Sequence, residues 1–502
     1  RHASLFGGYR RTSGFRDHER GNATSVGGSV DLYRSAGATL SLSALDHSRD
    51  YDDPGPVTLS GVESARTSLP FFRFDENAEQ LRRLSLRGSA RIGDASALSA
   101  YLTGESASGD LTRTLQLAPD FADTKARATR ARRLIGSALV STELLKMPWP
   151  QRLVIGTDIS LGTLNSAYRP LLLGDASAYA VPSVTAGDID ASGSGSRDSF
   201  AAFAHWENIV TSRLRLVAGG RMDWMTDTYR TDVPAGVARF RSSPKAFSPK
   251  LGANFSYLEN ASQSGHVYAS FTRSFKAPTL DQLFDQRPIP IPVAPFSVTI
   301  SNPDLRPQHG VAVEAGIDHR AAFANGRGLD FTLAAYQQHM RDELDFDLGL
   351  FRYVNVGRSR HRGLELGLRA DAGSTSVFAT ATRQQVLAMN GDNTGKQLKA
   401  VPQQMLSAGI TSGPPRLQGT ISVSDFRGAY LDDANARRLP AYTRVDARLS
   451  SSVASLRVFV DALNLLDRKL ISSGFPDASG SGVAYYYPAA RRAVQVGIGS
   501  AW

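Results

Sequence analysis

Apolar and polar residues alternate along most of this chain, which is typical of β-strands with one apolar and one polar face. The last segment shows this clearly, because Val494, Val496 and Ile498 share one face while glycine and glutamine occupy the positions between them. Residues 364–369 and 444–449 alternate in the same way, with charged residues on the polar face. Charges at every second position favour a water-filled lumen opposite a lipid-facing surface.

Short and long connections between these segments alternate along the chain. The short connections are Ser35 to Gly37, Asp94-Ala95, Thr211-Ser212, Ala324 to Gly328, Asp371 to Ser374, Gly413 to Arg416 and Ser450 to Ser455. The long connections are Asp52 to Glu79, Leu111 to Arg127, Asn165 to Arg197, Thr226 to Lys245, Lys276 to Gln308, Met389 to Ala400, Arg427 to Pro440 and Asp467 to Tyr485. An antiparallel barrel places every second connection on the same rim.

These two patterns predict an all-β fold, a transmembrane antiparallel β-barrel with short periplasmic turns and long extracellular loops. About 20 strand segments can be placed, and barrels of about 22 strands have a lumen wide enough to require a plug. We therefore expect about 22 strands in the complete barrel. Aromatic residues near strand ends, among them Trp206, Tyr442 and Tyr485 to Tyr487, are interpreted as girdles at the membrane interfaces.

Composition supports one large barrel. The 502 residues exceed the roughly 250–300 that one soluble core supports, yet no boundary between unlike domains is visible, so residues 1–502 are interpreted as one barrel domain. A hydrophobic content of 41% and a mean hydropathy of −0.23 exclude a helical membrane protein. The chain has no cysteine, which excludes disulfides and thiol chemistry and is compatible with passage through an oxidising periplasm.

The net charge of +10 does not indicate nucleic-acid binding, because the arginines are dispersed rather than gathered in one patch. No Gly-x-Ser-x-Gly nucleophile motif is present, and residues 391–397 only approximate a phosphate-binding loop. The alternating Glu343, Asp345 and Asp347 could attract a cation, but solvated surface is the more common role of such residues. We expect no catalytic residues, no cofactor, no metal site and no nucleic-acid partner.

Several motifs occur in an order that resembles the TonB-dependent outer-membrane receptors, which import iron-siderophore complexes and related scarce nutrients. The motifs are Ser274 to Leu280 followed by Leu283-Phe284, Asn302 to Pro307, Tyr353 to Gly357, Arg362 to Glu365, Asp461 to Asp467, and Tyr487-Pro488 with Arg491-Arg492. The resemblance covers nearly the whole chain as the barrel domain. Most of these residues are interpreted as architectural, because proline ends strands and glycine permits bulges.

The resemblance implies a receptor in the bacterial outer membrane, in contact with outer-membrane lipid, that imports an iron-siderophore or similar chelate. It also implies energy supplied by the TonB-ExbB-ExbD complex through a plug that fills the barrel. Neither the plug nor the TonB box is recognisable in this sequence, because Leu5 to His18 already looks like an early barrel strand. A first strand is expected to be missing as well.

The residues expected to bind ligand are arginines and aromatics of the long loops, because they offer charge-assisted hydrogen bonds and flat surfaces to a large, often anionic chelate. The candidates are Tyr51, Phe71, Phe72, Arg73, Tyr168, Arg169, Phe284, Arg287, Phe296 and Tyr430. A passive porin-like channel is the alternative function. A barrel enzyme is the third, although no nucleophile motif supports it.

Overall fold

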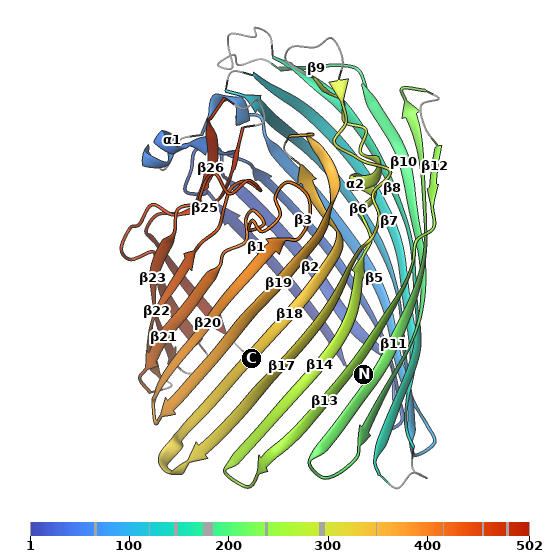
Figure 1. Cartoon of the computed structure of the whole chain (residues 1–502), viewed down its shortest axis with the longest axis vertical. Helices are drawn as coiled ribbons and strands as arrows, with labels where there is room; N and C mark the ends of the chain where they lie inside the picture. Colours follow the sequence, from blue (N-terminus) through green and yellow to red (C-terminus); the bar gives the residue numbers. More distant parts are fainter. Residues whose placement is uncertain are drawn as a thin grey trace.

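The chain forms one large antiparallel sheet that curves into a barrel (Figure 1). The computed structural model describes residues 2–64, 68–119, 121–144, 149–173, 184–235, 239–290, 297–347, 349–414, 416–453, 456–477 and 481–500. The sheet contains 22 strands within these residues, of which β9 and β12 are short extensions of three and four residues. The predicted transmembrane β-barrel is confirmed.

The wall strands in chain order are β1 (Ala3–Thr12), β2 (Gly21–Arg34), β3 (Ala38–Asp52), β5 (Glu76–Ile92), β6 (Ser96–Ala118), β7 (Phe121–Glu143), β8 (Gln151–Leu173), β10 (Ala191–Ile209), β11 (Leu214–Val233), β13 (Lys245–Glu259), β14 (Gln263–Lys276), β17 (Gln308–Phe323), β18 (Arg327–Asp347), β19 (Arg352–Ala372), β20 (Thr375–Ala388), β21 (Gln404–Ser412), β22 (Leu417–Arg427), β23 (Tyr442–Val453), β24 (Leu456–Leu463) and β27 (Ala493–Ser500). The connections contain β4 (Val57–Thr58), α1 (Leu59–Ser64), η1 (Pro70–Phe72), β9 (Val184–Ala186), β12 (Arg239–Ser242), α2 (Leu280–Phe284), β15 (Ile289–Pro290), β16 (Ser297–Val298), η2 (Ala324–Gly326), β25 (Ile471–Pro476) and β26 (Ala484–Pro488).

Each wall strand pairs antiparallel with the next wall strand along the chain, from β1 to β27. Within the described residues no pairing joins β1 to β27. The rim with the long connections is called the extracellular end, and the rim with tight turns the periplasmic end. In the described parts of the chain, no helix is long and apolar enough to cross a membrane.

The two faces of the wall differ as the alternation predicts. Outward side chains are apolar and exposed, as shown by Leu364 (54%) and Ile421 (57%). Inward side chains pair with one another, for example Arg448 with Asp461 at 2.5 Å and Arg369 with Asp371. Lipid covers the first kind of surface, and water in the lumen solvates the second.

One predicted long loop is in fact strand. Residues 111–127 were expected to form a loop, but β6 and β7 continue to Ala118 and Phe121 and remain paired, with one register irregularity after Gln116. The hairpin extends because its ladder satisfies the backbone polar groups, and Thr114 and Thr124 hydrogen-bond across it (2.8 Å). Strands also continue into the predicted connections 165–197 and 450–455.

The extracellular connections pack against one another in two small apolar clusters. Val57, Val62 and Ile471 form one cluster, and Leu283, Phe284 and Leu305 form the other. β4 also pairs with β26, so connections from opposite ends of the sequence share the three-stranded sheet β25-β26-β4 (Figure 1). These contacts hold the loops over the lumen.

A charge on the lipid-facing surface should destabilise the barrel. Ile421 lies in β22 beside outward residues Ile410 and Ala447, so Ile421→Arg places a cation in hydrocarbon. We expect the free energy of unfolding to fall by about 2–4 kcal/mol, measured by guanidinium titration in lipid vesicles. Ser422→Arg is the matched control, because Ser422 faces the lumen. Equal losses in both variants would contradict the assignment of faces.

Candidate functional site

A cavity of about 470 Å³ lies at the extracellular mouth of the barrel. Its lining comes from the tops of five wall strands and from the connections that contain η1, α2, β25 and β26. The principal side chains that line it are Asp53, Phe72, Asp75, Leu111, Arg113, Lys125, Arg127, Tyr168, Asp281, Asp285, Arg287, Phe346, Phe351, Tyr353, Phe475 and Tyr487. Connections distant in sequence therefore meet at one site.

One wall of the cavity is cationic. Arg113 in β6 pairs in register with Lys125 in β7, and Arg127 pairs with Tyr168 of β8. Successive strand residues point to opposite faces, so these alternate positions all face the lumen. Lys125 binds Asp190 at 2.5 Å, whereas Arg127 lies 5.2 Å from the centre of the Tyr168 ring.

The short helix α2 is fixed beside this wall. Thr279 caps it, accepting a hydrogen bond from the backbone of Gln282, whose side chain accepts one in return. Arg127 makes two hydrogen bonds to Asp281 (2.6 and 2.9 Å), and the Tyr168 hydroxyl donates to Asp285 (2.8 Å). Paired donors on a carboxylate fix orientation as well as distance.

The segment after α2 is anchored by Arg287. Its guanidinium donates to the Asp123 side chain (2.8 Å) and to the backbone oxygens of Asp123 and Arg113. Arg287 is buried, with 5% of its surface exposed. Arg287 therefore ties this connection to the β6–β7 hairpin and is not a freely accessible cation.

Aromatic rings form another part of the cavity lining. Phe346 packs edge-on against Phe351 (5.4 Å between ring centres) and Tyr353 (5.3 Å). Phe475 of β25 lies 6.2 Å from Tyr487 of β26. Such rings offer flat apolar surfaces, and the tyrosines add hydroxyl groups.

Among the described residues, Arg113 is the cation of this site whose side chain has no anionic partner. The other three cations are engaged, Lys125 with Asp190, Arg127 with Asp281 and Arg287 with Asp123. The charge of Arg113 acts on both Asp75 and Tyr487, so its guanidinium lies near an acidic and an aromatic group of the lining. An anion entering the cavity would meet this guanidinium.

The acidic groups of the site are perturbed by burial. Burial raises the pKa of Asp75 to about 7, although hydrogen bonds from the Thr114 hydroxyl and backbone oppose the shift. Asp53 adds to the rise and Arg113 opposes it. Burial also raises the pKa of Asp285 and that of Tyr487. The charge of the cavity therefore changes near neutral pH.

The structure brings three of the ten predicted ligand residues to this cavity, namely Phe72, Tyr168 and Arg287. Phe284 is buried beside it, stacked on Tyr229 at 4.8 Å. Phe296 lies outside the described residues.

The remaining candidates do not line the cavity. Tyr51 accepts a hydrogen bond from Asn77 (2.8 Å), and Arg169 donates to the backbone of Gly187 (3.4 Å). Arg73 lies over the ring of Phe74, and Tyr430 lies under the guanidinium of Arg438. Phe71 accepts a hydrogen bond from Thr114 through its backbone oxygen.

Sequence reasoning missed several residues of the site. Arg113 and Arg127 were assigned to a loop. Counting alternate positions from the inward Glu105 and Arg133 places both on the inner face, but only once the strands are known to continue through residues 111–127. Tyr485 to Tyr487 were interpreted as part of a membrane girdle, which is wrong. They lie in β26, where Tyr485 is 1% exposed and Tyr487 lines the cavity.

The carboxylates of the acidic face of β18 are engaged in contacts within the protein. Glu343 accepts a hydrogen bond from Ser359 and lies 3.6 Å from His361, while Asp345 pairs with Lys399. Asp347 accepts from the backbone of Gly349 (2.8 Å). Among the described residues, no group of three or more histidine or acidic side chains is placed to hold a metal ion.

Comparison with known families decides the relationship of this barrel. The family model described as "TonB dependent receptor-like, beta-barrel" matches residues 6–465. The chain belongs to the TonB-dependent receptor family. Receptors of this family are transporters rather than enzymes, and the family match favours an energised receptor over the porin-like alternative.

Solved structures share the fold at low sequence identity. The unliganded ferric citrate transporter FecA matches with a TM-score of 0.79 and 12% identity, covering 99% of this chain and 72% of FecA. The siderophore receptor PiuA from Acinetobacter baumannii matches with a TM-score of 0.78 and 14% identity, covering 99% of this chain and 76% of PiuA. The ferric yersiniabactin uptake receptor FyuA from Yersinia pestis matches with a TM-score of 0.73 and 15% identity, covering 99% of this chain and 74% of FyuA.

Removing the Arg127 guanidinium should loosen α2. Arg127→Ala deletes both hydrogen bonds to Asp281, so hydrogen exchange in residues 279–287 should accelerate roughly 5- to 30-fold, equivalent to about 1–2 kcal/mol of local stability. This expected loss of local stability is smaller than for a fully buried ion pair, because the Asp281 side chain is 45% exposed to solvent. Arg130→Ala is the control, because its pair with Asp110 is exposed at 3.6 Å. Unchanged exchange in Arg127→Ala would contradict the anchoring role.

Asp75 should make stability depend on pH. Its native pKa is raised to about 7 from about 3.9 in the unfolded chain, so its contribution to stability is complete below pH 4 and is lost as pH rises to 7. Asp75→Asn abolishes this titration. We expect the variant's stability relative to wild type to increase from pH 5 to pH 7 by up to about 1.4 kcal/mol per pH unit, then level off. The measurement is guanidinium unfolding of both proteins at several pH values. A difference in free energy of unfolding between Asp75→Asn and wild type that stays constant with pH would contradict this prediction.

Proposed function

We propose that this receptor lies in the bacterial outer membrane and imports an anionic ferric chelate, with energy supplied by the TonB-ExbB-ExbD complex. The observation that carries the proposal is the mouth cavity, which Arg113 lines together with aromatic residues from three connections. The names of FecA, PiuA and FyuA, which refer to ferric citrate, siderophore and ferric yersiniabactin uptake, agree with this class of ligand.

The size and chemistry of the cavity support a small polar ligand. Its volume of about 470 Å³ falls within the roughly 300–1,000 Å³ typical of ligand sites. A carboxylate or catecholate oxygen of the chelate can accept hydrogen bonds from Arg113, while its rings or chains pack on Phe346, Phe351 and Tyr487. The protein performs no chemistry on the iron, which is cargo.

The proposed coupling to TonB and the outer-membrane location rest on family membership and on the lipid-facing surface of the wall. The ion pairs of the inner face leave a polar lumen through which a released chelate can pass once the path is open. The loops at the mouth select the ligand, and the wall provides the route.

Arg113→Ala should weaken binding of an anionic ferric chelate by roughly 10- to 100-fold, because one charge-assisted hydrogen bond is worth about 1.5–3 kcal/mol. Tryptophan fluorescence quenching of the folded protein would measure this with ferric citrate, ferric catecholates and a neutral ferric hydroxamate as probes.

The control is Arg438→Ala, which removes a loop arginine that lies over Tyr430, outside the cavity lining. The affinity of Arg438→Ala for the anionic ferric chelates should match that of wild type. The neutral hydroxamate should be much less sensitive to Arg113→Ala. Equal losses for charged and neutral chelates, or saturable binding of none of the probes, would overturn the proposal.

A further inference from the structure

The outer wall carries a second cavity, larger than the mouth site, of about 1230 Å³. Its lining extends across the wall from β1 to β10. In the middle of this lining the outward residues of β6 are small, Gly104 and Ser106, and Leu84 of β5 and Leu134 of β7 flank them. Leu84 is 55% exposed and Leu134 is 38% exposed. A Cβ atom added to Gly104 would meet no atom within 4 Å, so the groove is open above it.

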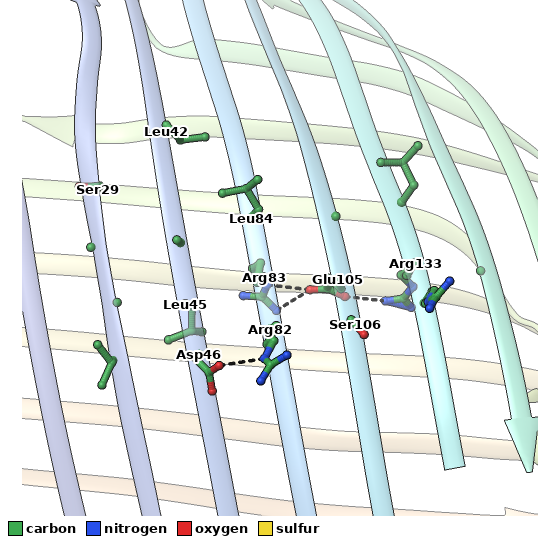
Figure 2. A pocket seen from close by; sticks show the side chains of 18 of the residues that line it. Ser29, Leu42, Leu45, Asp46, Arg82, Arg83, Leu84, Glu105, Ser106 and Arg133 are labelled. Atoms are coloured by element: carbon green, nitrogen blue, oxygen red, sulfur yellow. Dashed lines mark hydrogen bonds and ion pairs between the residues drawn. The ribbon is translucent and has the colours of Figure 1, made fainter.

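Two arginines flank one end of this groove. Ser106 pairs in register with Arg82 on one side and with Arg132 on the other. Neighbouring strands lie about 4.8 Å apart, so the two arginine backbones are separated by about 10 Å with a small hydroxyl between them. Figure 2 shows Arg82, Leu84 and Ser106 around this end of the groove.

The neighbouring Arg83 and Arg133 belong to the other face of the wall. They lie beside Glu105, at 2.7 and 3.9 Å, in the row of dashed contacts in Figure 2. Because consecutive strand residues point to opposite faces, this row faces the lumen while Arg82 and Arg132 face outward. The outward arginines are therefore not neutralised by Glu105.

The outward arginines retain donors for an anion. Asp46 accepts from the Nε of Arg82 (3.0 Å) and lies at 3.4 Å from the Gln80 amide. Within the described part of the chain, the terminal nitrogens of Arg82 and the whole Arg132 guanidinium make no hydrogen bond to another group. Asp198 also borders the cavity, but it lies in β10, beyond β8, and its register partner is Leu161 rather than the Arg132 partner Thr163.

The arginine pair lies at the upper edge of the apolar surface. Strand β6 begins at Ser96, about ten residues before Ser106. A strand tilted by about 45° rises roughly 23 Å along the membrane normal over that length. The apolar band of such barrels is about 25 Å tall. Beyond it, Arg130 and Asp110 form an exposed ion pair on the same face. Headgroups of the outer leaflet lie at this level.

We propose that this groove binds one phosphorylated lipid of the outer leaflet. Its phosphate lies between Arg82 and Arg132 above Ser106, and an acyl chain lies along Gly104 between Leu84 and Leu134. Arginine matches phosphate through paired N–H donors, and the leucines bury hydrocarbon. The proposal rests on the outer-membrane location but does not depend on the ligand at the mouth.

Native mass spectrometry of the full chain in detergent can test this with a bisphosphorylated lipid A as probe and its dephosphorylated form as comparison. The double variant Arg82→Gln/Arg132→Gln should reduce retention of the phosphorylated lipid by roughly tenfold or more. Gly104→Leu should reduce retention of both lipids, because it fills open space without disturbing the wall. Arg130→Gln is the matched control on the same strand and face as Arg132, and should bind as wild type.

Ferric-chelate binding measured on the same samples separates this proposal from the function proposed for the mouth. We expect chelate affinity to be unchanged in all three variants. Equal retention of both lipids by wild type, undiminished retention by the double variant, or an equal loss in Arg130→Gln would show an unspecific lipid shell and overturn the assignment.

Discussion

The backbone must satisfy its hydrogen bonds without water wherever it crosses a bilayer, and the rest of this structure follows from that requirement. Each wall strand meets it by pairing with its neighbours in sequence. Because the pairing uses backbone groups alone, side chains are free to differ between the two faces. The outer face can then be apolar, and the inner face can carry ion pairs such as Arg448 with Asp461.

The same pairing explains the position of the ligand site. Strands β6 and β7 continue beyond the apolar band and carry Arg113 and Arg127 to the mouth. There the ladder alone does not fix the connections, so ion pairs, hydrogen bonds and small apolar clusters do. Asp281 and Asp285 hold α2 to the wall, while β4 and β26 join the first and last connections. The cavity is the space these attachments leave.

Both faces of the wall therefore bear on function. Inward arginines of β5 and β7 share Glu105, whereas the adjacent outward arginines lack that carboxylate. A shift of one position along the strand separates a lumenal ion pair from a groove for phosphorylated lipid. The period of two in the sequence thus specifies two surfaces with different partners.

The sequence by itself determined the fold class, the sorting of short and long connections, and the face of most strand residues, since alternation and turn chemistry are local properties. It could not determine where β6 and β7 end, because polar residues in a paired hairpin look like loop residues. Nor could it select the site. Phe72, Tyr168 and Arg287 were found by residue type, but Tyr51 and Tyr430, of the same type, lie elsewhere. Only the tertiary structure brings Arg113, Phe346 and Tyr487 together, because contacts between distant connections depend on how the loops fold over the barrel.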